Sequence, residues 1–439
     1  MIKFVHCADV HFGMENYGRI DPETGIHTRL LDFERAFNAC IDKAIAEQVD
    51  FFLFCGDAYK TANPSPTQQK LMLKCLLRLY KAGIPAVIVV GNHDNPLTFG
   101  KASSMEVFGD LPLEGFHVVD KPTTIKLTTK NGPVQIVGIP WPTRNTISLS
   151  NKHLLKDAHE ITSYISAAVA HIISDMAQKL DPSMPAVLGS HMTVSSGIFS
   201  GSEKRAIYGN DPVLLPSQLA IAPFDYIALG HLHRYQNLNP NGIPIVYSGS
   251  IERVDFGERK EDKGFCLVTI HDPAFAKATA GTVKLKAQGG IYPERSEGVR
   301  RTTYEFIKTP MRPFIQMEIE LHNERNQTDQ ILDEIKKYDI TGAVIKILYH
   351  VPVDRKDFVE LKVIERALTS AMHVVGIIPI RPVAKREARA TMKVHMDLPT
   401  LLDTYFDTKP EYKDKKDDLI KKTILLFEES KDKTEENCC

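Results

Sequence analysis

Long apolar runs are absent from this sequence of 439 residues. No stretch of about 18 or more apolar residues occurs, so no membrane-spanning helix is expected. The first residues enter a strand-like apolar pattern at once and lack the charged, apolar and small-residue zones of a signal peptide. We therefore expect a cytoplasmic protein of two or three domains, without a membrane anchor.

Cysteine is scarce, and charge of one sign is lacking. The seven cysteines include no CxxC pair, which disfavours a zinc site built on thiolates. Five of them lie in apolar segments, as buried thiols do: Cys7, Cys40, Cys55, Cys75 and Cys266. The net charge is −1. A protein that binds duplex DNA by bulk charge would be more basic, so contact with DNA would need a local patch, metal ions or a partner.

Five short apolar runs in the first 235 residues show little alternation, which is typical of strands buried on both faces. They are Ile2–Ala8, Val49–Cys55, Ile84–Val90, Ala186–Gly189 and Tyr226–Leu229. Between them, apolar residues at spacings of three and four predict helices near 30–45, 71–80 and 160–180. Strands that alternate with helices predict a layered α/β core.

The remaining sequence suggests three further segments after a first domain at 1–270. Residues 271–302 have no period and are interpreted as an irregular insertion. Residues 303–390 mix alternating and helical patterns, which predicts a small α+β domain. Residues 391–439 hold two amphipathic segments and a charged tail. The two apolar stripes are Leu398, Leu401, Leu402 and Tyr405, and Leu419, Ile420, Thr423, Ile424 and Phe427.

Each predicted strand of the first domain leads into a polar cluster. The clusters are Asp9-Val10-His11, Gly56-Asp57, Gly91-Asn92-His93-Asp94, Ser190-His191 and Gly230-His231-Leu232-His233. The carboxyl ends of strands form the ligand crevice of α/β sheets, so we expect these loops to converge. The glycines before the ligands are expected to permit positive φ and close approach of the backbone. Ser190-His191 is the weakest cluster, because a histidine there is more often part of the core.

The residue types indicate a site for two divalent ions. The candidate ligands are Asp9, His11, Asp57, Asn92, His191, His231 and His233. Carboxylate, imidazole and carboxamide ligands suit Mn²⁺, Fe²⁺, Zn²⁺ or Mg²⁺, and seven are too many for one tetrahedral ion. We predict that Asp57 bridges the ions. Asp9, His11 and His233 would complete one ion, and Asn92, His191 and His231 the other.

Two residues next to the ligands are predicted to act in catalysis. His93 would protonate the leaving oxygen or stabilise charge on the transition state. Asp94 would hold the other ring nitrogen of His93 and fix its tautomer.

The five clusters resemble the signatures of the calcineurin-like metallophosphoesterase superfamily. That resemblance implies a two-layer β-sandwich with mixed sheets, flanked by helices. Three further features resemble the SbcD-type DNA repair nucleases, the nuclease half of SbcCD: Asp9-Val10-His11-Phe12-Gly13, the segments 247–253 and 256–258, and the α+β pattern after residue 312. This finer resemblance implies two manganese ions, DNA as substrate, a homodimer, a DNA-capping role for residues 303–390 and an SbcC-like coiled-coil ABC ATPase as partner.

The sequence has no Gly-x-x-x-x-Gly-Lys-Ser/Thr loop, so any dependence on ATP must come from another subunit. We expect the segments 396–406 and 416–428 to dock on the coiled coil of that ATPase. The alternative is that this helix pair packs on the protein's own core.

Two surfaces follow from softer signals. The segments 62–80 and 97–108 are predicted to form a dimer face through Leu71, Leu76, Leu79 and Phe108, although core packing explains the same stripe. A phosphate track for DNA, or simply a solvated surface, is the interpretation of six basic residues: Arg29, Lys60, Arg144, Arg253, Arg259 and Lys260.

Two other functions remain open from the sequence. A small-molecule phosphodiesterase or protein phosphatase would use the same metal core. A non-catalytic scaffold that tethers DNA is disfavoured, because the ligand set is complete and His93 is present, whereas a decayed site would have lost some of these residues.

Overall fold

The computed structural model describes residues 1–96, 101–110, 114–143, 158–201, 211–272, 300–322, 324–352, 356–381, 397–407 and 409–435. The chain divides into two compact units. The first comprises 1–317, 332–347 and 360–377, and the second comprises 318–331, 348–359 and 378–439. The domain limits predicted from the sequence stay predictions, and residues 273–299 of the expected insertion lie outside the described residues.

The first sheet holds the first three predicted strands and has six strands in the order β14-β13-β1-β2-β3-β4. Strands β1 to β4 run parallel, β13 pairs antiparallel with β1, and β14 pairs antiparallel with β13. Their bounds are β1 Ile2–Cys7, β2 Phe51–Cys55, β3 Ala86–Val89, β4 Phe116–Val119, β13 Gly264–His271 and β14 Arg301–Lys308.

The second sheet holds the other two predicted strands in the order β11-β12-β10-β7-β6-β5. Strands β6, β7, β10 and β12 run parallel, and β5 and β11 pair antiparallel at the two edges. Their bounds are β5 Thr123–Thr129, β6 Gly132–Ile139, β7 Ala186–His191, β10 Tyr226–Gly230, β11 Gln236–Asn237 and β12 Ile245–Tyr247. The short strands β8 (Thr193–Val194) and β9 (Val213–Leu214) pair separately.

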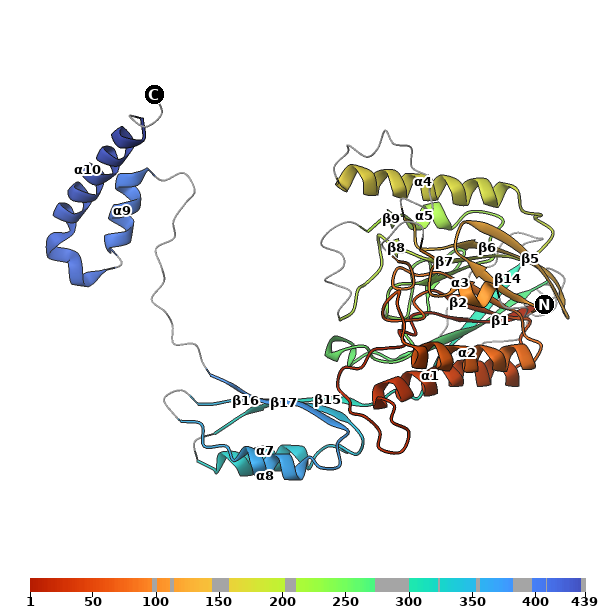
Figure 1. The fold of residues 1–439 in the computed structure, drawn as a ribbon, viewed down its shortest axis with the longest axis horizontal. Helices are drawn as coiled ribbons and strands as arrows, with labels where there is room; N and C mark the ends of the chain where they lie inside the picture. The colour runs from red at the N-terminus through yellow and green to blue at the C-terminus, as the bar shows by residue number, and fades with distance from the viewer. Residues whose placement is uncertain are drawn as a thin grey trace. The chain divides into compact units, whose positions relative to one another are not determined.

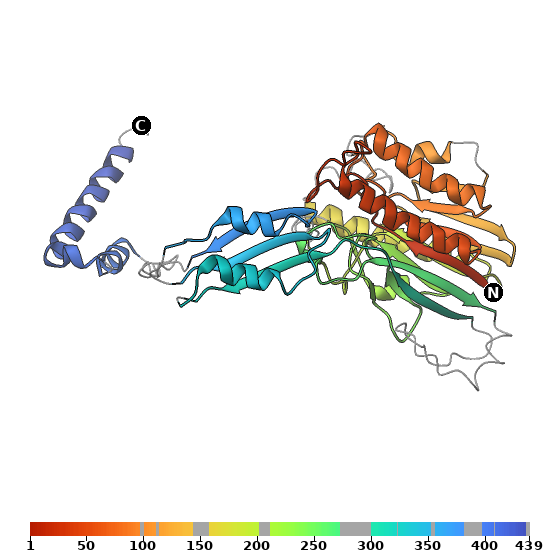
Figure 2. The same cartoon turned by 90° about the horizontal axis from the view of Figure 1, so that it is seen from below.

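The two sheets pack face to face, and helices cover their outer faces (Figures 1 and 2). In β2, Phe51 and Leu53 pack between the sheets, whereas Phe52 packs against α1 (Thr28–Ala46) and α2 (Pro66–Lys81). Helix α4 (Ala158–Gln178) packs on the second sheet. Because both faces of the central strands are covered, their side chains are buried without alternation, as predicted. The mixed sandwich flanked by helices is confirmed.

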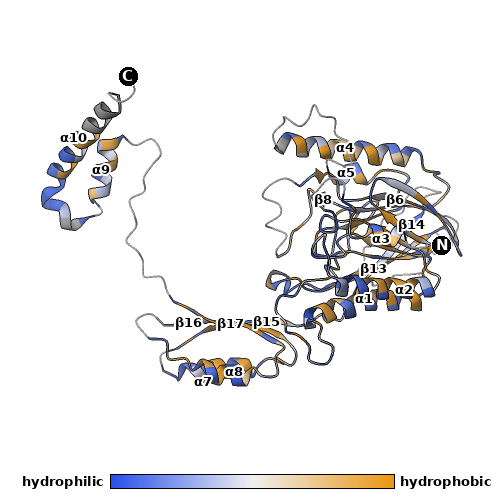
Figure 3. Cartoon of the chain, viewed as in Figure 1, coloured by the Kyte–Doolittle hydropathy of each residue, from blue (hydrophilic) through white to orange (hydrophobic). Residues whose placement is uncertain are grey.

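Helix α2 begins at a capping box, in which Ser65 and Gln68 each accept a hydrogen bond from the other's backbone amide. Its apolar stripe faces inward, as the mix of orange and blue along α1 and α2 in Figure 3 reflects. The four residues predicted to form a dimer face, Leu71, Leu76, Leu79 and Phe108, are all buried in the core. The prediction that these residues form a dimer face is therefore wrong, because the apolar stripe of α2 packs on the first sheet.

The chain after β14 adds a three-stranded sheet, two helices and a helix pair. The sheet has the order β15-β16-β17. Bounds are β15 Phe314–Glu320, α7 Gln327–Ile335, β16 Val344–His350, α8 Leu361–Ala367, β17 His373–Ile380, α9 Leu398–Asp407 and α10 Lys416–Glu435. The short helices elsewhere are α3 Glu106–Gly109 and α5 Pro216–Leu219. No described helix is long and apolar enough to cross a membrane.

Candidate metal centre

The loops that follow β1, β2 and β3 of the first sheet meet the loops that follow β7 and β10 of the second. Backbone hydrogen bonds join the first two loops, from Asp9 N to Gly56 O and from His11 N to Asp57 O, each 3.0 Å. Both oxygens of Asp9 lie 3.1 Å from the backbone N–H of His231, which ties the first sheet to the second. The predicted ligands are therefore gathered by both layers of the sandwich.

The backbone is strained at four of the predicted ligands. Asp9, His11, Asp57 and His231 have φ values of 54°, 49°, 59° and 104°. Positive φ in residues other than glycine costs about 1–3 kcal/mol and is often found at functional sites. These turns direct the side chains of successive loops toward one another.

The glycines before the ligands serve two different needs. Gly56 has the expected positive φ, at 90°. Gly230 does not: a Cβ on it would lie 1.9 Å from the carbonyl oxygen of Cys55. Close approach of β10 to β2, rather than positive φ, requires glycine at this position.

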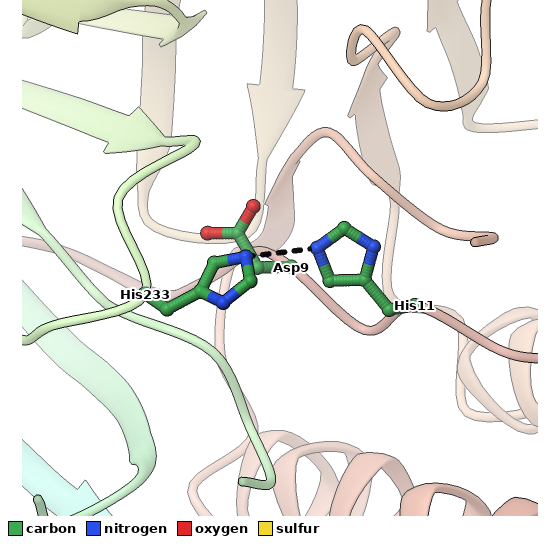
Figure 4. Close-up of side chains that lie close together, drawn as sticks. All are labelled: Asp9, His11 and His233. Atoms are coloured by element: carbon green, nitrogen blue, oxygen red, sulfur yellow. Dashed lines mark hydrogen bonds between the residues drawn. The ribbon is translucent and has the colours of Figure 1, made fainter. Parts of the chain in front are cut away.

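Asp9, His11 and His233 form the first group of side chains (Figure 4). The Nε2 atoms of His11 and His233 are 3.0 Å apart. Nδ1 of His233 lies 2.8 Å from Oε1 of Glu258, a carboxylate that accepts its hydrogen. In neutral His233 the lone pair is therefore on Nε2, directed toward His11.

Asn92, His191 and His231 form the second group. Oδ1 of Asn92 lies 2.9 Å from Nε2 of His191 and 3.3 Å from Nδ1 of His231. Nδ1 of His191 donates to the carbonyl oxygen of Cys55 at 2.8 Å, so Nε2 carries the lone pair in the neutral ring. Lone pairs of a nitrogen and an oxygen thus face each other.

Asp57 lies between the two groups. Its Oδ2 atom is 3.6 Å from Nε2 of His11 and 3.4 Å from Nε2 of His191. Its Oδ1 atom accepts a hydrogen bond from the backbone N–H of His93 at 2.9 Å. The position agrees with a bridging role, which stays a prediction.

His93 is exposed at the edge of this cluster, and its ring is held by the backbone. Nδ1 of His93 donates to the carbonyl oxygen of Lys60 at 2.7 Å, which leaves Nε2 for a substrate. The predicted role of Asp94 as its partner is wrong. Asp94 is buried and its carboxylate turns away from the ring of His93 to accept from the backbone amides of Asp57, Tyr59 and Gly91.

Burial and the neighbouring charges shift the protonation of the centre. Burial raises the pKa of Asp9 to about 7, although His191 and His233 oppose this. Burial would also raise the pKa of Asp57, but His191, His93 and His11 hold it well below its usual range. Burial acts to lower the pKa of His191, and Asp57 outweighs it to raise this pKa to about 9. Without cations, the site must hold protons to balance its carboxylates.

Several contacting residues were missed by the sequence analysis as parts of the site. Trp141, after β6, lies with its ring 4.8 Å from that of His231. Oδ2 of Asp211 is 3.5 Å from Nε2 of His231. Glu258 and Lys263 form a buried ion pair behind His233, with 3.0 Å between Oε2 and Nζ. None of these residues carries a motif of its own, and only the resemblance in segment 256–258 gave a signal, for Glu258.

The proposed phosphate track loses two members. Arg29 is fully buried, pairs with Asp32 and lies over the rings of Phe33 and Phe314. Arg253 donates to the carbonyl oxygens of Arg312 and Glu261. Arg144 lies outside the described residues. Lys60 and Lys260 are exposed and remain candidates for contact with phosphate, and Arg259, next to Lys260 in sequence, is half-buried.

Residues 2–235, more than half of the chain, match the family described as calcineurin-like phosphoesterase. The chain belongs to this family. A dimetal phosphatase from Danio rerio aligns with it at a TM-score of 0.35 and 10% identity, over 61% of this chain and 92% of that one. The TT1561 protein of Thermus thermophilus aligns at a TM-score of 0.33 and 10% identity, over 57% of this chain and 90% of that one.

Membership of the calcineurin-like phosphoesterase family implies a metal-dependent phosphoester hydrolase with a dimetal centre. The residues fit such a centre, because ring nitrogens of both histidine groups and the carboxylate of Asp57 converge in buried space, where they can act as ligands once cations replace the protons. When bound, two divalent ions would supply Lewis acidity that activates a water molecule and offsets charge on a phosphate.

The chain's own residues would then orient the reaction. Asp57 and the two groups would hold the ions in the predicted split between them. His93, fixed by the carbonyl of Lys60, would present Nε2 and, when protonated, give that proton to the leaving oxygen.

Proposed function

We propose that this protein is a DNA nuclease of the SbcD type, which hydrolyses phosphodiester bonds at DNA ends and hairpins for repair and recombination. The observation that carries the proposal is the length of chain beyond the family match at residue 235. The sheet β15-β16-β17, its helices and the pair α9 and α10 follow it. A phosphatase of small substrates needs none of these additions, whereas a nuclease that caps DNA and binds a partner has a use for both.

Digestion of labelled duplex and hairpin DNA with Mn²⁺ tests the proposal. The wild type should cut both. Asp57→Ala should lose metal and activity, because it removes the carboxylate between the two groups. His93→Ala should retain metal and lose cutting, because Asp57 and the two groups keep all the candidate ligands, although His93 lies close to His11 and Asp57. A wild type that leaves DNA intact but hydrolyses bis(p-nitrophenyl) phosphate or a phosphopeptide would favour the alternative function. Normal cutting by both variants would exclude the assigned roles, and binding without cutting would favour a scaffold.

We further propose that α9 and α10 dock on the coiled coil of an SbcC-like ABC ATPase. No side chain of α9 is buried, and α10 exposes Leu425, Leu426 and Phe427. Exposed apolar side chains on a helix are suited to packing against the helices of a coiled coil. Truncation after Arg389 should abolish co-purification with the ATPase.

A point variant tests the same surface with the chain intact. Leu426→Glu should weaken co-purification, whereas Lys421→Glu, an exposed polar position on the same helix, should not. If the truncated chain still co-purifies, the helix pair does not dock there and packs elsewhere.

The proposal also includes manganese as the metal and a homodimer as the working form. Both rest on the resemblance to the SbcD-type nucleases. For the dimer, no other support remains, because the residues of the dimer face predicted from the apolar stripe are buried. A mass in solution of twice the chain supports the dimer, and a monomeric mass removes it. Lys60→Gln and Lys260→Gln should lower the salt dependence of DNA binding if these side chains contact phosphates.

A further inference from the structure

A buried ion pair lies behind one of the predicted metal ligands. Glu258 and Lys263 are both fully buried, and their charged atoms are 3.0 Å apart. Burying two charges costs several kcal/mol each unless every polar atom has a partner. The contacts of this pair indicate its role, because both of its members contact His233.

Glu258 is fully engaged at both carboxylate oxygens. Oε1 lies 2.8 Å from Nδ1 of His233. Oε2 accepts from the backbone N–H of Val254 at 2.8 Å and pairs with Lys263. Because Val254 and Lys263 hold the carboxylate of Glu258 at Oε2, its Oε1 atom holds the imidazole of His233 in a fixed orientation.

Lys263 holds the same histidine by its backbone. Its Nζ atom donates to the carbonyl oxygen of His233 at 2.9 Å and to Oε2 of Glu261 at 3.0 Å. The lysine thus compensates the charge of Glu258 and restrains the chain at His233. Side chain and backbone of one residue are held by a single ion pair.

We propose that Glu258, backed by Lys263, is a positioning residue of the metal centre, which fixes His233 so that Nε2 faces the ion. A carboxylate on Nδ1 keeps the hydrogen there and makes Nε2 the donor atom, and it raises the basicity of the ring. The orientation is visible in Figure 4, where Nε2 of His233 is the atom directed toward His11. The inference rests on the metal centre and not on the DNA substrate.

The test measures metal binding by the full-length chain after removal of metal with chelator. Calorimetric titration with Mn²⁺ should show two sites in the wild type. In Glu258→Gln, one of them should weaken by about 10–100-fold, as found when such partners of metal-bound histidines are lost. The Mn²⁺ concentration for half-maximal hydrolysis of bis(p-nitrophenyl) phosphate should rise by the same factor, with the KM for the ester unchanged at saturating Mn²⁺.

Glu261→Gln is the matched control, because Glu261 contacts the same lysine but no ligand, and it should bind Mn²⁺ as the wild type does. Glu258→Gln leaves Lys263 without its buried partner, so the double variant with Lys263→Met guards against loss of folding. If either folded variant binds both ions with wild-type affinity, the proposal is overturned. Unfolding of both variants would also overturn it, in favour of a purely structural ion pair.

Discussion

Asp94 joins the loops of the metal centre by accepting backbone hydrogen bonds. It is fully buried and accepts from the amides of Asp57 and Gly91 at 2.9 and 3.1 Å, and from Tyr59 at 3.2 Å. Asp94→Ala leaves these amides without an acceptor. We expect a loss of about 3 kcal/mol in the free energy of unfolding, because hydrogen bonds to buried charges are worth about 1.5–3 kcal/mol each.

Urea unfolding of metal-free protein measures this effect, and His93→Ala is its control. The exposed ring of His93 has one hydrogen bond to the backbone, so its loss should change stability by no more than about 0.5 kcal/mol. Equal stability of the two variants would show that the hydrogen bonds of Asp94 to the backbone do not stabilise the fold.

We expect His6 in β1 to make the free energy of unfolding depend on pH. It is fully buried between the hydroxyl of Tyr226 and the carbonyl of Leu229, and burial lowers its pKa to about 3. The unfolded chain binds a proton near pH 6.5 that the folded chain refuses. Stability from this residue is therefore complete above pH 6.5 and falls by about 1.4 kcal/mol per pH unit between 6.5 and 3.

The slope of unfolding free energy against pH, measured in EDTA between pH 7.5 and 5, should be shallower in His6→Gln than in the wild type. His171→Gln should leave the slope unchanged, because the His171 side chain is 77% exposed. If His6→Gln shows the wild-type slope, the low pKa is not what destabilises the protein in acid.

The predicted ligands were recognisable because each stands at or just beyond the end of a buried strand, so its position follows from the strand that precedes it. The partners of those ligands were not. Glu258 and Asp211 reach histidines of other loops, and Asp94 turns toward backbone amides instead of the neighbouring ring. These outcomes depend on side-chain direction and on contacts distant in sequence, which spacing does not encode.

At the scale of elements, Arg312 links the entry of β15 to α1 within the first unit. Its guanidinium pairs with both oxygens of Asp32, and Nη1 donates to the carbonyl of Gly342 at 2.6 Å. Arg312→Lys keeps the charge but loses the planar fork that makes these contacts together. We expect a loss of about 2 kcal/mol in unfolding free energy.

Arg35→Lys is the matched control, because Arg35 pairs with the same Asp32 from a side chain that is 51% exposed. Exposed pairs contribute about 0–1 kcal/mol, so this change should be small in chemical unfolding. Similar losses in the two variants would mean that the fork adds nothing beyond charge.

Elements buried on both faces were predictable, and edge elements were not. Strand β2 is apolar throughout, so its run stands out in the sequence. Strand β5 lies at an edge and is mostly exposed or half-buried, with threonine and lysine among its residues. The hairpin of β5 and β6 escaped notice for this reason. The stripe on α2 was visible, but periodicity does not say whether a helix faces a core or a partner.

For the molecule as a whole, the order of strands along the chain did not reveal how the strands divide between the two sheets. Strands β1, β2 and β3 belong to one sheet and β7 and β10 to the other, so the centre is built by both layers. The sandwich was expected from resemblance and not from the pattern of strands. The core between the sheets brings together Phe51, Leu53 and Val187, from segments more than a hundred residues apart, and no local pattern encodes this.

Because both sheets meet at the ligands, metal should stabilise the whole molecule. The ligand side chains gather from both layers, and four of the ligand residues have strained backbone, so cations that bind them would hold the two sheets together. A ligand at 100 times its Kd adds about 2.7 kcal/mol per site, so Mn²⁺ should raise the Tm by several degrees over protein in EDTA. Asp57→Ala should melt at the same temperature with and without Mn²⁺. An equal rise in that variant would place the stabilising ions elsewhere, and no rise in the wild type would show that the gathered side chains do not bind Mn²⁺.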